Sequence, residues 1–144
     1  MQLDTILELV KAIPAFQGRV HGALQLARLQ QQNQLPQVTP AAFVIPTGLT
    51  GGRVDTITGL YRQQVGESVA VVVVIRSADD PRSTRAMDPL SAVCWDVIHA
   101  LSGIEVGEVD GQLQFRRGFL VSLADSAAVY QLDFDLQDQM RIPR

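Results

Sequence analysis

The stretch 60-LYRQQVGESVAVVVVIRS-77 decides the fold of this 144-residue chain. Its second half runs from Val69 to Ile75 without a polar residue, and nearly all of these side chains are β-branched, which favours a strand. The run is also too short to cross a membrane as a helix. Because successive side chains of a strand point to opposite faces, the unbroken run predicts a strand in the middle of a sheet with both faces covered.

Composition indicates one acidic domain, residues 1–144, long enough to bury a core without metals or disulfides. Hydrophobic residues make up 47% and charged residues 19%, which leaves apolar surface for self-association. The net charge is −3 and Lys and Arg form no block, so the basic footprint of a nucleic-acid-binding protein is absent. Cys94 is the sole cysteine and the first residues lack a signal-peptide pattern, so we expect a reduced protein that is not exported.

Helices are predicted both before and after this strand in the sequence. Apolar residues recur at helical spacing over residues 3–10. Asp88 and Pro89 begin a second helix, because the Asp side chain satisfies free amides and Pro suits the first helical position; its apolar stripe continues to Gly103. Residues 20–35 are ambiguous, since their start alternates like a strand while the later residues are good helix formers, and a short helix is the favoured interpretation.

Further strands complete the pattern. Residues 41–45 form a short apolar strand, and residues 113–123 and 130–136 alternate as the two strands of a hairpin. Arg117 falls among the apolar positions of the first hairpin strand, where a buried arginine needs a carboxylate or carbonyl partner. Together the elements predict an α+β single domain with a mainly antiparallel four-stranded sheet covered by helices.

The sequence contains no pattern that indicates an enzyme. Residues 47–58 are expected to form a Gly-rich loop, which lacks the spacing of a phosphate-binding loop. Cys94 and His99 lie about 140° apart around one helix, so they cannot act together as nucleophile and base, and Cys94 is expected to be a small buried residue. His21 and His99 have no ligand-spaced carboxylates nearby. We therefore predict no catalytic residue, no metal ligand and no cofactor.

Asp133 and Asp135 project from one face of the last strand. Paired carboxylates can serve acid–base catalysis, but a strand face that meets solvent or another subunit shows the same spacing, and that is the favoured interpretation. Trp95 lies beside the centre of its helical stripe, where it is either an interface anchor or packed against a loop.

Over most of its length the chain resembles the tail terminator family of long-tailed bacteriophages and related prophages. The resemblance lies in the order and spacing of an N-terminal helix, PAAFVIP at 40–46, RQQV at 62–65 before the valine strand, RGFL at 117–120 and a final acidic and aromatic strand around Phe134. It implies a small α+β subunit that forms a ring, commonly a hexamer, on the head-proximal end of the tail tube. Such a ring stops tube polymerisation and presents the surface that joins the head.

The resemblance also implies where the protein is found and what it contacts. The implied partners are further copies of the chain, the tail tube protein and a head–tail connector or head-completion protein. DNA can pass through the ring without sequence-specific binding, and no membrane is involved. The implied locations are the virion and, during assembly, the host cytoplasm.

Polar positions on three segments are the candidate subunit or tube interface. They are Arg62, Gln63, Gln64, Arg82, Arg85, Gln131, Asp133 and Asp135. Opposite charges on these segments can set the register between subunits. Two other functions remain open: a small ligand-binding domain or enzyme with a ferredoxin-like fold, and another neck or tail-completion protein.

Overall fold

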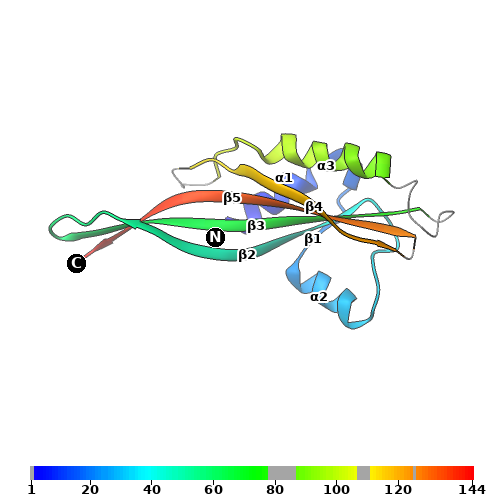
Figure 1. Cartoon of the computed structure of the whole chain (residues 1–144), viewed down its shortest axis with the longest axis horizontal. Coiled ribbons are helices and arrows are strands. Elements are labelled where there is room, and N and C mark those ends of the chain that lie inside the picture. Colours follow the sequence, from blue (N-terminus) through cyan, green and yellow to red (C-terminus); the bar gives the residue numbers. More distant parts are fainter. Residues whose placement is uncertain (1, 78–86, 107–110, 125) are drawn as a thin grey trace.

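One five-stranded sheet runs through the molecule, with helices on both of its faces (Figure 1). The computed structural model describes residues 2–77, 87–106, 111–124 and 126–144. In chain order the elements are α1 (Leu3–Lys11), a 3-10 turn (Pro14–Phe16), β1 (Val20–Gly22), α2 (Ala23–Gln31), β2 (Ala41–Val54), β3 (Leu60–Arg76), α3 (Met87–Leu101), β4 (Gln114–Ala124) and β5 (Ala127–Pro143). The strands lie in the order β1-β2-β3-β5-β4.

The predicted α+β class is confirmed, but the prediction of a four-stranded antiparallel sheet is wrong. β1 is a fifth strand, and it pairs in parallel with β2, with Val20 opposite Ala42, so the sheet is mixed. β1 has only three residues, too few for alternation to distinguish a strand from the start of a helix, and α2 follows it directly. The ambiguous segment 20–35 therefore contains both a strand and a helix.

β3 is covered on both faces, as its apolar run predicts. Val71 and Val73 are fully buried in the larger core, which α1 and α3 complete on one face of the sheet. Val72 and Val74 are buried in a smaller core with Phe43 on the other face, beneath α2. The sheet thus separates two cores of unequal size.

Both helices of the larger core are present as the sequence predicts, but α3 begins before the predicted Asp88 cap and contains Asp88 in its first turn. α1 buries Ile6 and Val10 on its inner side. α3 starts at Met87, directly before the Asp-Pro pair, and ends ahead of Gly103, whose φ of +81° is the left-handed conformation that glycine adopts at this position.

α2 covers the second face only in part. No residue of α2 is fully buried, and only Leu26 and Leu29 pack against the smaller core. A hollow of about 540 Å³ remains between α2 and the sheet, bordered by Val121 of β4 and Val129 of β5. The apolar side of the sheet therefore continues beyond α2 towards β4.

Three strands continue past the helices as an arm, defined here as residues 46–66 and 137–144 (Figure 1). Within the arm β3 lies between β2 and β5, so that Gln63 has Val54 on one side and Met140 on the other. The predicted loop over residues 47–58 is wrong for most of its length, because β2 continues to Val54. Pairing with β3 holds these glycines in a strand that their own weak strand propensity does not indicate.

Candidate assembly surfaces

The interface residues expected from the sequence do not form one site. Arg82 and Arg85 lie outside the described residues. Of the others, Arg62, Gln63 and Gln64 lie on β3 in the arm, whereas Gln131, Asp133 and Asp135 lie on β5 where it pairs with β4. Register separates the two groups, since Gln64 is opposite Gln139 and it is Ser68 that faces Asp135.

Two of the three expected residues on the arm, Arg62 and Gln63, form hydrogen bonds within it. The Arg62 guanidinium donates to the Asp55 carboxylate at 2.7 Å (Nη2 to Oδ2) and to the Asp55 carbonyl at 3.1 Å (Nε to O). The Gln63 amide accepts a hydrogen bond from the Tyr61 hydroxyl at 2.8 Å and donates to the Gly52 carbonyl at 3.3 Å. Gln64, by contrast, is exposed. Arg62 and Gln63 thus fix the shape of the arm from within.

The β5 group forms two ion pairs with β4. Arg117 donates to Asp133 at 2.8 Å (Nε to Oδ2), and Arg116 lies 3.5 Å from Asp135 (Nη1 to Oδ2). Ser68 also donates to Asp135, at 3.1 Å. Each carboxylate therefore has its own arginine partner within the subunit.

Arg117 has the carboxylate partner that the sequence predicts, but it is not buried. Its side chain is 66% exposed, while that of Asp133 is 14% exposed. Register shifts between Phe115 and Arg117, and between Leu120 and Ser122, break the alternation of β4. As a result Phe115 packs edge-on against Phe134 in the larger core, and Arg117 lies on the opposite face.

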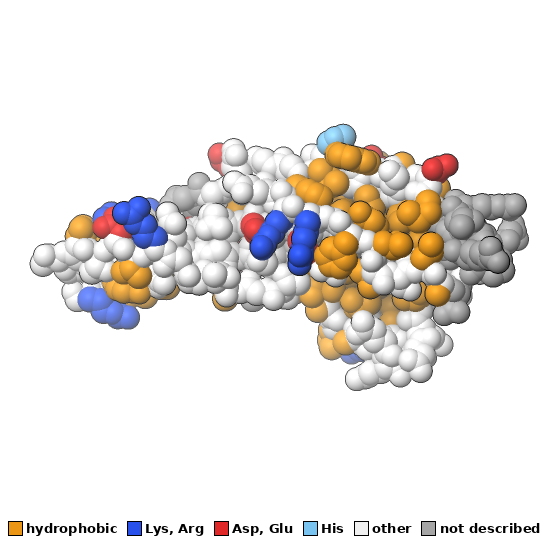
Figure 2. Space-filling model, viewed as in Figure 1, with side chains coloured by type: hydrophobic (Ala, Val, Ile, Leu, Met, Phe, Trp, Pro, Cys, Tyr) orange, Lys and Arg blue, Asp and Glu red, His pale blue; other side chains and the backbone are white. Residues whose placement is uncertain are grey.

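β4 is an open edge of the sheet and carries apolar side chains on both of its faces. Phe119, Leu120, Val121 and Leu123 are all exposed by more than a third. Edge strands of monomers usually carry charges that prevent pairing with another chain. Figure 2 shows hydrophobic side chains gathered over this end of the molecule, away from the arm. The sequence signal for this surface is a run of three apolar residues, 119–121, which Gly118 separates from two arginines.

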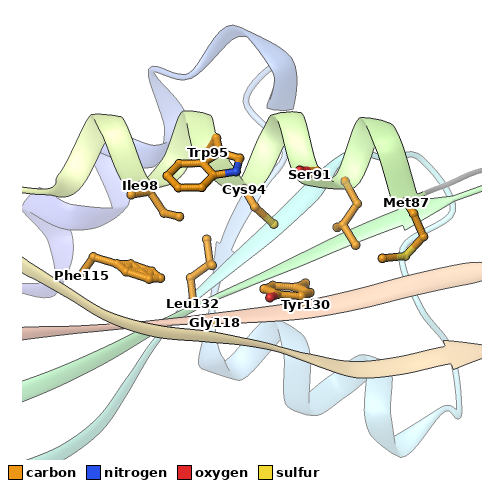
Figure 3. Close-up of a pocket in the computed structure, with 10 residues that line it drawn as sticks. Met87, Ser91, Cys94, Trp95, Ile98, Phe115, Gly118, Tyr130 and Leu132 are labelled. Atoms are coloured by element: carbon orange, nitrogen blue, oxygen red, sulfur yellow. The ribbon is translucent and has the colours of Figure 1, made fainter.

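An apolar groove of about 450 Å³ lies between α3 and the β4–β5 pair, and we call it the α3–β4 groove (Figure 3). Met87, Ser91, Trp95 and Ile98 border it from α3, and Phe115, Gly118, Tyr130 and Leu132 from the sheet. Trp95 is 56% exposed, with its ring 5.8 Å from that of His99. Trp95 is therefore not buried against a loop, and its role at an interface stays a prediction.

Gly118 shapes the α3–β4 groove because it has no side chain. A Cβ at this position would lie 2.8 Å from Tyr130 Cε1 and 2.9 Å from Leu132 Cδ2, closer than real side chains approach. A side chain at position 118 would therefore force Tyr130 or Leu132 to shift from the positions in which they shape the groove.

Cys94 lies beneath the groove and is buried, as predicted. Burial raises the pKa of its thiol to about 11, because the thiolate would lose its hydration. At neutral pH Cys94 is therefore a protonated, apolar side chain and a poor nucleophile.

Within the part of the chain that the structure describes, no group of three or more His, Cys, Asp or Glu side chains is arranged to hold a metal ion. No helix among these residues is long and apolar enough to cross a membrane.

Comparison with known proteins gives a family match over nearly the whole chain. The family model described as "Phage tail terminator protein" matches residues 3–144. A chain of the solved structure titled "Virion of native gene transfer agent (GTA) particle" is 15% identical and has a TM-score of 0.59, covering 97% of this chain and 95% of that chain. A second solved chain, 16% identical, reaches a TM-score of 0.43 over 98% of this chain and 92% of its own. The comparison with curated proteins gives no match.

Proposed function

The chain belongs to the phage tail terminator protein family, and from this premise we propose that it forms a ring that caps the head-proximal end of the tail tube. The ring stops tube polymerisation and presents the surface to which the head is joined. The family is one of structural phage proteins, and the likeness in fold to a chain of a virion is consistent with that role. The proposed locations are the virion tail and, during assembly, the host cytoplasm.

Ring formation is supported by the difference between the two ends of the subunit. One end carries the apolar β4 edge and the α3–β4 groove, and the other is the mostly polar arm. A two-fold dimer joins a surface to itself, whereas a closed ring needs two different surfaces that fit each other. This asymmetry is the observation that carries the proposal, with six copies as the expected number.

The residues expected at the interface receive separate roles in this proposal. Arg62 and Gln63 maintain the arm, and the exposed Gln64 is available to a neighbouring protein. Asp133 and Asp135 hold the two exposed β4 arginines in place, so that the arginines rather than the carboxylates meet a partner. The proposed partners are further copies, the tail tube protein and a head–tail connector or head-completion protein.

The proposal assigns no catalytic activity to the chain. The buried thiol of Cys94 is protonated at neutral pH, and each of the paired carboxylates has an arginine partner, so neither group is poised for catalysis. DNA passes through the ring without sequence-specific contacts.

Deletion of the gene from its phage tests the proposal. We expect headless tails, many of them longer than normal, because nothing stops the tube or offers the head a docking surface. Complementation by the wild-type gene should restore both tail length and head attachment. Tails of normal length already joined to heads in the deletion would overturn the proposal.

One observation favours a second function, ligand binding. The volume of the α3–β4 groove is within the range of small-molecule pockets, and Ser91 and Tyr130 supply hydroxyl groups at its border. A thermal-shift screen of metabolites and metals tests it, since a specific ligand raises the melting temperature of the folded state. Stabilisation that Gly118→Leu abolishes would favour the groove as a ligand site.

A further inference from the structure

The subunit divides its charge between the arm and the remainder of the chain, which we call the body. The arm contains four arginines (Arg53, Arg62, Arg141 and Arg144) and two aspartates (Asp55 and Asp138), for a formal charge of +2. The whole chain has a net charge of −3, so the body carries −5. Contact between two arms or between two bodies sets like charges together, whereas contact between arm and body brings opposite charges together.

The arm exposes apolar side chains as well as arginines. Leu49 and Val54 on β2, and Ile57 in the turn before β3, are between 51% and 61% exposed. Figure 2 shows hydrophobic side chains beside basic ones towards the end of the arm. None of the helices that the structure describes lies over either face of the arm, so these side chains are available to another molecule (Figure 1).

The α3–β4 groove has the complementary character. It is apolar, with Met87 and Trp95 exposed at its border. α3 carries two exposed aspartates: Asp88 follows Met87 at the border of the groove, while Asp96 borders a hollow on the side of α1. α3 has no Lys or Arg. The two arginines of β4 lie on the opposite face of the sheet from Phe115, where they pair with the carboxylates of β5. A basic, partly apolar segment therefore meets no basic side chain from α3.

We propose that in the ring the arm of one copy lies in the α3–β4 groove of the next copy. This inference rests on the proposed ring and assigns the two surfaces that close it. Leu49, Val54 and Ile57 of the arm cover Trp95 and its neighbours, and Arg53 lies near the acidic α3. Because arm and groove are different surfaces, each copy gives its arm to one neighbour and receives the arm of another, which closes a ring.

Cross-linking in assembled tails tests the contact directly. Ile57→Cys and Trp95→Cys are combined in one full-length chain that replaces the wild type in the phage, and purified tails are treated with a short bismaleimide. Denaturing gels are expected to show dimers and a ladder of larger multimers. The matched control replaces Ile57→Cys by Leu24→Cys, a position on α2 that is 68% exposed against 51% for Ile57, and should give no ladder. Both chains retain the buried Cys94.

A charge exchange gives a second readout. Arg53→Glu is expected to lower the amount of chain incorporated into tails by about tenfold, and Asp88→Arg in the same chain to restore most of it. The control Arg28→Glu makes the same charge change on exposed α2 and should leave incorporation unchanged. Thermal melting of each purified variant verifies that it folds.

The outcomes separate this inference from the proposed function. Tails that contain the chain but give no ladder, with no rescue by Asp88→Arg, overturn the arm–groove contact and leave the ring standing. Tails from the wild-type phage that lack the chain overturn the proposed function and the contact together. A ladder from the test pair alone supports both.

Discussion

Arg117 of β4 donates to Asp133 of β5 across a 2.8 Å hydrogen bond between Nε and Oδ2. This ion pair joins the edge strand to the sheet within one subunit and leaves the Arg117 side chain 66% exposed. The negative charge of Asp133 on the last strand is thus neutralised by Arg117 of the same subunit. In the proposed assembly, the exposed cation is held in place by that same carboxylate.

A charge exchange at this pair separates folding from assembly. Asp133→Lys places two cations together and should lower the free energy of unfolding by about 1 kcal/mol, since exposed pairs contribute little. Adding Arg117→Asp restores an opposite pair and most of that stability, as measured by urea denaturation. If Arg117 meets a partner, the double variant should still assemble poorly. Normal assembly of the stable double variant would exclude this pair from the interface.

A charged side chain on either face of β3 should destabilise the folded state. Val71→Asp and Val72→Asp each bury an unpaired carboxylate, one in each core, and should lower the free energy of unfolding by more than about 4 kcal/mol. Urea denaturation of the purified variants, or their failure to accumulate as folded protein, measures the effect. A Val72→Asp variant of near wild-type stability would mean that α2 does not seal its face.

Cys94 should react slowly in the folded protein. Its pKa of about 11 keeps the thiol protonated at pH 8, and burial restricts access, so a thiol reagent should label the native chain far more slowly than the urea-unfolded chain. Because the pKa is raised from 9.0, the folded state retains a proton that the unfolded state releases, and stability should fall as pH rises from about 9 to 11.

Cys94→Ala removes this titration and provides the control. Its stability at neutral pH should change by no more than about 2 kcal/mol, as for a small core residue. Its alkaline loss of stability should be smaller than that of the wild type. Rapid native labelling at pH 7 would contradict the assignment of a buried, protonated thiol.

Gly111 should not tolerate a side chain. A Cβ there would collide with the backbone carbonyl of Gln137 on β5, which cannot move aside as a flexible side chain can. Gly111→Ala should therefore lower the free energy of unfolding by about 1–3 kcal/mol, in the range of overpacked sites. Gly48→Ala is the control, because a Cβ at Gly48 meets nothing within 4 Å. Equal stability of the two variants would contradict the close approach.

The sequence predicted the elements whose signals are strong and local. The valine run of β3 and the Asp-Pro start of α3 each depend on a few adjacent residues. It missed β1 because three residues are too few for alternation to be recognised. It missed most of distal β2 because pairing with β3, rather than propensity, holds Gly51 in a strand. These errors come from contacts distant in sequence.

The candidate surfaces were less accessible to prediction from sequence than the fold. The interface residues that the sequence suggests are polar, and several of them have partners within the subunit, as Arg62 has in Asp55. The α3–β4 groove depends on how α3 lies over Gly118 and Tyr130, which only tertiary packing determines. Register shifts in β4 also reversed the face assigned to Arg117.

Electron cryomicroscopy of the intact virion tests the central claim most directly. The account predicts a closed ring of this chain between the last layer of the tail tube and the head connector, with the arm of each copy lying against α3 of the next. Finding the chain elsewhere in the particle, or finding no ring of it at the head-proximal end of the tail, would contradict the account.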